Sequence, residues 1–94
     1  MSDITATTVT ADGVAVAHPA RVKSIYYIRG SSAGSIVLKD GGSGGTTLLT
    51  LTTPGAGSGV DAANTMSIPS DGLRFSTHVY VDVTNVTSVT VCHA

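Results

Sequence analysis

The chain has 94 residues, enough for one domain but not for a second hydrophobic core. Charged residues make up 12 % of the sequence, and the formal net charge is −1. Five Lys and Arg residues form no basic run and are interleaved with six Asp, so counterion release offers little affinity for a phosphate backbone. No apolar run approaches the roughly 20 residues that span a bilayer. We therefore expect neither a nucleic-acid partner nor a membrane partner.

The uncharged part of the sequence is dominated by fourteen Thr, eleven Ser and eleven Gly. Neutral hydroxyl groups are buried at little cost when they find hydrogen-bond partners, and a net charge near zero does not oppose association. This composition favours a subunit of a permanent assembly, with a soluble β-sandwich of neutral surface as the alternative. Cys92 is the single cysteine, which excludes an internal disulfide, and the N-terminal segment lacks signal-peptide features, which predicts synthesis in a cytoplasm.

Apolar residues recur mainly with a period of two, in segments rich in Val, Ile and Thr, which predicts strands and no helix. In chain order, the expected strands cover residues 3–10, 13–17, 21–29, 35–40, 46–53, 65–69, 73–76, 78–84 and 86–93. About eight short strands in a domain of this size predict an all-β fold, either a small β-sandwich or a jelly roll. We expect residues 20–94 to form that domain.

The alternation within the strands predicts which side chains enter the core. In the segment 78–84 the valines share one face, whereas His78, Tyr80 and Asp82 share the other. The short connection at residues 84–86 predicts that the last two strands are hairpin partners. The expected core residues are Val79, Val81, Val83, Val89, Val91, Leu49 and Leu51, with Tyr27, Met66 and Phe75 as larger fillers.

The first segment, residues 1–19, is expected to be an N-terminal strand or arm. It carries four Thr around Ile4 and Val9 and few large apolar groups, so folding it onto its own domain would bury little surface. Added to the edge of a neighbouring subunit's sheet, its backbone groups would find hydrogen-bond partners. We therefore expect this segment to contribute to contacts between subunits.

We expect no catalytic, cofactor-binding or metal-binding residues. Three His, six Asp and eleven Ser allow a Ser-His-Asp set by composition alone, but the loop at residues 57–59 is not the Gly-x-Ser-x-Gly turn that exposes a nucleophile. The glycines between Gly41 and Gly45 are not followed by the Lys and Ser or Thr of a phosphate-binding loop.

A metal site could be imagined from His78 and Asp82, with Cys92 or His93 nearby. Positions i and i+4 of a strand are roughly 13 Å apart, too far for one ion unless a neighbouring strand contributes. A polar outer or intersubunit face is the better interpretation of these residues, and His18, which precedes Pro19, is expected only to help the chain turn. Tyr26 is expected on an outer face, and by itself it does not indicate a glycan-binding module.

Four segments resemble the small β-rich virion proteins of tailed bacteriophages: residues 21–27 (RVKSIYY), 35–42 (SIVLKDGG), 68–75 (IPSDGLRF) and 84–91 (TNVTSVTV). The resemblance covers roughly residues 20–94. It implies a non-enzymatic virion structural protein, foremost a capsid decoration or cement protein that binds and stabilises the major capsid shell. Such proteins are commonly trimers of jelly-roll or sandwich domains, which implies a homo-oligomer, located in the virion after assembly in the host cytoplasm. The alternative it leaves open is a tail, connector or fibre component with a receptor- or glycan-binding role.

Overall fold

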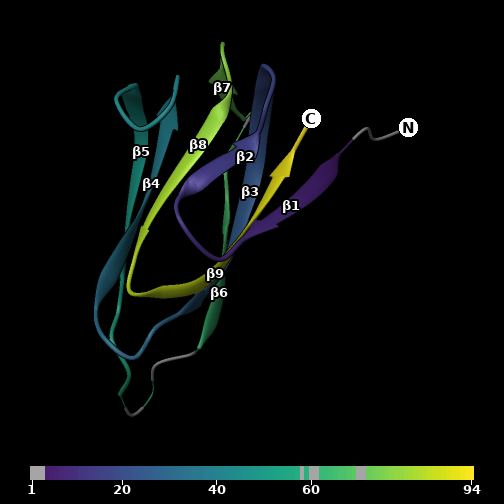
Figure 1. Cartoon of the computed structure of the whole chain (residues 1–94). Coiled ribbons are helices and arrows are strands. Elements are labelled where there is room, and N and C mark those ends of the chain that lie inside the picture. Colours follow the sequence, from purple (N-terminus) through teal and green to yellow (C-terminus); the bar gives the residue numbers. More distant parts are fainter. Residues whose placement is uncertain (1–3, 58, 60–61, 70–71) are drawn as a thin grey trace.

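The computed structural model of the chain describes residues 4–57, 59, 62–69 and 72–94 (Figure 1). Every element in this part of the chain is a strand. The strands are β1 (Thr5–Val9), β2 (Gly13–Val16), β3 (Ala20–Arg29), β4 (Gly34–Asp40), β5 (Thr46–Thr53), β6 (Ala63–Ser67), β7 (Leu73–Phe75), β8 (Val79–Thr84) and β9 (Val86–His93). The expected all-β fold is confirmed.

The strands form two antiparallel sheets packed face to face. The first sheet has the order β1-β9-β3-β6, with the short β7 also paired to β3, and the second sheet has the order β2-β8-β4-β5. When β7 is set aside, this is the strand order of an eight-stranded jelly roll, a double-sheet architecture built from two Greek keys. The molecule measures 38 × 33 × 18 Å, and its smallest dimension is what two sheets about 10 Å apart produce.

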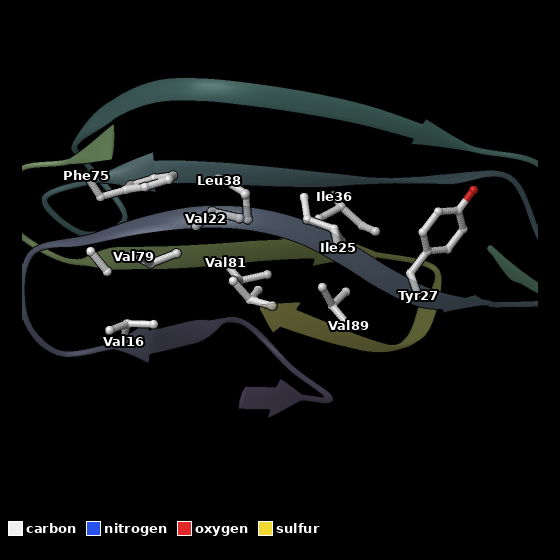
Figure 2. Packing of buried hydrophobic residues seen from close by; sticks show 12 residues of the cluster. Val16, Val22, Ile25, Tyr27, Ile36, Leu38, Phe75, Val79, Val81 and Val89 are labelled. Atoms are coloured by element: carbon white, nitrogen blue, oxygen red, sulfur yellow. The ribbon is translucent and has the colours of Figure 1, made fainter. Parts of the chain in front are cut away.

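The core lies between the two sheets and consists of small aliphatic side chains with two aromatic rings (Figure 2). Period-two alternation directs one face of each central strand into this layer. Val79, Val81, Val89 and Val91 are fully buried, as is Phe75, and Tyr27 is 6 % exposed. The remaining buried apolar residues are Val16, Ala20, Val22, Ile25, Ile36 and Leu38.

Several expected core residues lie at the rim of the core. Leu49, Leu51 and Val83 pack against it but are only partly buried. Met66 is half-buried on β6, where it is paired with Ile25 in the edge position of the first sheet. A residue on an edge strand has a neighbouring strand on one side only, which leaves part of its side chain uncovered.

The hairpin expected at residues 84–86 does not form. β8 belongs to the second sheet and β9 to the first, so the two strands are not paired with each other. Asn85 takes a left-handed φ of 52° and its carbonyl accepts a hydrogen bond from Gly30 N–H at 2.9 Å. This hydrogen bond holds the connection between β8 and β9 against the connection between β3 and β4. A Cβ on Gly34 would overlap the Thr84 carbonyl, so only glycine permits this approach.

The sixth strand begins and ends earlier than expected, at Ala63–Ser67. Pro69 has no N–H to continue a ladder. Ile68 N–H still donates to Lys23 O at 2.9 Å, beside the register shift of β3 between Val22 and Ser24. The backbone pairing therefore ends one residue beyond the strand.

Residues 4–19 are divided between the two sheets of the chain's own domain. β1 pairs with β9 from Thr5↔His93 to Val9↔Val89, and β2 pairs with β8. Val9 packs against the core, and Asp12 Oδ1 accepts a hydrogen bond from Val83 N–H at 2.7 Å. The arm was expected to pair with a neighbouring subunit, whereas this segment pairs with β9 and β8 of its own chain. The open edge of β9 offers the same main-chain hydrogen bonds within the chain. An additional contact of this segment with a neighbouring subunit stays a prediction.

Candidate docking surface

The outer face of the first sheet carries an uncharged set of side chains that we call the neutral face. Strand register aligns them in three rows across the sheet. The rows are Ala6–Cys92–Ser24–Ser67, Thr8–Thr90–Tyr26–Thr65 and Ser88–Ile28–Ala63. None of these side chains is buried.

The neutral face follows from alternation on strands whose other side is the core. On β9, Val89 and Val91 are fully buried, which turns Thr90 outward. Thr8 Oγ1 and Thr90 Oγ1 form a hydrogen bond of 2.8 Å across the β1–β9 pair, so part of the hydroxyl set is already ordered. Tyr26 lies in the central row with 41 % of its surface exposed. The result is a surface of small hydroxyl groups around one aromatic ring.

At one end of the same outer face, Arg21 and Arg74 lie directly opposite each other in the β3–β7 pair. Their strand neighbours Ala20, Val22 and Phe75 are buried, so both arginines point outward. Beside them is a shallow hollow of about 420 Å³. It is lined by Pro19, Ala20, Arg21, Arg74, Phe75 and Ala94.

The outer face of the second sheet has its charges at the centre, and they are paired. Lys39 Nζ lies 3.7 Å from Asp82 Oδ2, and it also donates a hydrogen bond to Ser43 O at 3.0 Å. The pairing of β4 with β8 places Lys39 opposite Tyr80 and Val37 opposite Asp82. These charges therefore find partners within the chain.

His93 is buried on the inner side of the first sheet, close to its β1 edge. Its Nε2 forms a 3.1 Å hydrogen bond with Thr7 Oγ1. Burial, followed by the charge of nearby His18, lowers the pKa of His93 below its usual 6.5. In its neutral form, His93 thus helps to hold β1 against β9.

Asp40 has a different role, at the end of β4. It accepts hydrogen bonds from the Ser76 hydroxyl at 2.8 Å, from Thr77 N–H at 2.9 Å and from Ser76 N–H at 3.1 Å. The Ser76 hydroxyl and the backbone N–H groups lower the pKa of Asp40 below 3.8. Its carboxylate fixes the segment between β7 and β8.

The residues weighed for metal binding are divided between the sheets. Asp82 is on the second sheet and His78 immediately precedes β8, whereas Cys92 and His93 are on β9 of the first sheet. No group of three potential metal ligands occurs among the described residues. Cys92 lies on the neutral face, between Ala6 and Ser24.

The remaining residues singled out in the sequence have local structural surroundings. His18 Nδ1 donates a hydrogen bond to Pro19 O at 2.9 Å at the entry to β3. The glycine segment closes the β4–β5 hairpin, with Gly45 N–H donating to Gly42 O at 2.9 Å. Ser58, the serine of the 57–59 loop, lies outside the described residues.

No protein-family model matches the chain, and searches of curated proteins and of solved structures find no significant match either. In the part of the chain that the structure describes, no helix is long and apolar enough to cross a membrane.

Sequence reasoning missed the neutral face and the arginine pair as units. Tyr26 was expected on an outer face, but nothing local shows that Thr8, Thr90 and Thr65 share its row. Arg21 and Arg74 are far apart in the chain and meet only through the β3–β7 register. The one available signal was alternation, since each arginine has apolar residues on both sides.

Proposed function

We propose that this chain is a non-enzymatic structural protein of a virus particle, a capsid decoration or cement protein of a tailed bacteriophage. It acts as a homo-oligomer, with a trimer favoured, and binds and stabilises the major capsid shell. The observation that carries the proposal is the neutral face, which spans four strands of the first sheet. Small hydroxyl side chains and one exposed tyrosine can be covered by another protein without desolvating a charge.

Two further observations support the proposal. The strand order is that of a jelly roll, an architecture that occurs in viral capsid proteins and in lectins. Fold alone does not decide function, so the sequence resemblance to small phage virion proteins is what favours a structural role in a virus particle.

The second candidate function is a tail, connector or fibre component that binds a receptor glycan. Tyr26 favours it, because an exposed aromatic ring among hydroxyl groups is a surface on which a sugar can stack. A glycan array distinguishes the two: a decoration protein gives no signal, whereas a glycan-binding component gives one that Tyr26→Ala abolishes.

The decoration role is tested on particles of the phage that encodes the chain, prepared without this protein. Tyr26→Glu places a charge at the centre of the neutral face, and we expect it to weaken attachment by about 2 kcal/mol or more, as for a central interface tyrosine. Tyr80→Glu is the matched control, because Tyr80 also points outward from a central strand but on the second sheet. Failure of the wild-type protein to attach, or equal attachment of both variants, contradicts the proposal.

A further inference from the structure

Arg21 and Arg74 form a cross-strand pair of like charges. They are directly opposite in the antiparallel register of β3 and β7, and both are exposed. Side chains in this relation have Cβ atoms about 4.5–5.5 Å apart, and like charges placed so destabilise the strand pair. A negatively charged group between them removes this repulsion.

Neither guanidinium group finds a partner in the part of the chain that the structure describes. The ion pair found there is Lys39–Asp82, and neither Arg21 nor Arg74 makes a side-chain hydrogen bond to a described residue. The shallow hollow of about 420 Å³ gives access to both side chains from solvent. The pair is therefore open to an external anion.

The neighbouring surface indicates what carries that anion. The arginines lie at the end of the neutral face, whose rows contain no charged residue. A phosphate backbone needs several cations in a track, and the whole chain has only five Lys and Arg. A protein surface that covers the neutral face needs only one carboxylate at this end. Guanidinium groups bind carboxylates through paired, charge-assisted hydrogen bonds.

The described aspartates of a second copy are poor sources of that carboxylate. Among the described aspartates, Asp12 accepts the Val83 N–H, Asp40 accepts from Ser76 and Thr77, and Asp82 pairs with Lys39. Each already has a partner within its own chain, which lowers what it gains from a contact with the arginines of a neighbour.

We propose that the Arg21–Arg74 pair is a binding site for a carboxylate of a different protein that covers the neutral face. The site itself follows from the pair and its hollow. The identity of the carrier rests on the proposed assembly function, which predicts a partner on that face.

The site is tested first on the free protein, with citrate as the probe. At constant ionic strength, citrate should shift the side-chain Nε–Hε signals of Arg21 and Arg74 and raise the melting temperature, whereas chloride should do neither. Arg74→Glu supplies a carboxylate from within, so it should raise the melting temperature and abolish the citrate-induced shift of Arg21. Lys23→Glu makes the same charge change outside the hollow and should preserve the shift.

Three results on the free protein overturn the site. They are citrate shifts no larger than those with chloride, equal shifts with inorganic phosphate, or a lower melting temperature for Arg74→Glu. The first shows that no anion binds there, the second shows that the pair does not select a carboxylate over a phosphate, and the third shows that the two arginines do not repel each other.

The partner is tested by attachment to particles that lack the protein. The double variant Arg21→Gln/Arg74→Gln should attach at least about tenfold more weakly, equivalent to about 1.4 kcal/mol. Lys23→Gln should attach like the wild type. If the wild type attaches and the double variant attaches equally, the carboxylate contact is wrong while the decoration role stands. If the wild type does not attach, the decoration role fails, and a change in sedimentation of the double variant would assign the site to a second copy instead.

Discussion

The outer faces of the two sheets are built from the same kind of alternating strand but differ in where their charges lie. On the second sheet, Lys39 and Asp82 lie 3.7 Å apart at the centre of the face. On the first sheet the centre is uncharged, and Arg21 and Arg74 lie opposite each other at one end. The second sheet satisfies its charges within the chain, whereas the first leaves two like charges exposed. We therefore expect a partner with a carboxylate to stabilise the first face more than the second.

Removing β1 is expected to lower the melting temperature most, because it takes one strand from the first sheet. It leaves the outer face of the second sheet unchanged. Deleting residues 2–10 uncovers the β9 edge, removes the Thr7–His93 hydrogen bond and exposes the core beside Val9. The loss of a partly buried valine is worth about 1–2 kcal/mol. We expect a protein that is still β-rich by circular dichroism but melts roughly 5–15 °C lower.

The same deletion tests the role of the segment between subunits. An unchanged melting temperature together with lost oligomerisation or attachment would show that β1 acts mainly in intersubunit contacts. Normal stability and normal attachment would show that the segment contributes to neither.

The pH dependence of unfolding is expected to come from the β1 edge of the first sheet. Because the folded-state pKa of His93 is lowered, its stabilising contribution is complete above pH 6.5 and is lost as the pH falls through the folded-state pKa. The free energy of unfolding should therefore decrease as the pH falls below 6.5, by at most about 1.4 kcal/mol per pH unit. The lowered pKa of Asp40 acts in a separate window, since its contribution is lost only below pH 3.8.

Chemical denaturation at several pH values checks this expectation with two variants. His93→Gln should flatten the pH dependence between pH 7 and pH 5, whereas His18→Gln should keep most of it because burial is the larger cause of the lowered pKa. An unchanged slope in His93→Gln would assign the pH dependence to another group.

The smallest expected effect concerns the charges of the second sheet. A double-mutant cycle with Lys39→Met and Asp82→Asn should give a favourable coupling of about 0.3–0.5 kcal/mol, because the pair is partly exposed. The corresponding cycle with Arg21→Gln and Arg74→Gln should give a coupling of opposite sign. Couplings of the same sign in urea denaturation would show that the two faces do not differ in the way their charges interact.

The strand pattern could be predicted from the sequence because β-strands leave a local signature. Alternation of Val with polar residues in the segment 78–84 assigned Val79 and Val81 to the core, and both are fully buried. Gly and Asp at the turns separated the strands, so the expected boundaries differ from the observed ones by few residues. Local chemistry was enough because side chains alternate with a period of two whichever strand lies beside them.

Pairing between strands was decided only by the tertiary structure. The short connection at Asn85 looks like a hairpin turn, but it carries the chain from one sheet to the other. The expected arm found its partner in β9 of its own chain. The Arg21–Arg74 pair and the row through Thr8, Thr90, Tyr26 and Thr65 depend on the same pairing. Alternation determines which face of a strand a residue is on, whereas only long-range backbone hydrogen bonds determine which residue of another strand lies beside it.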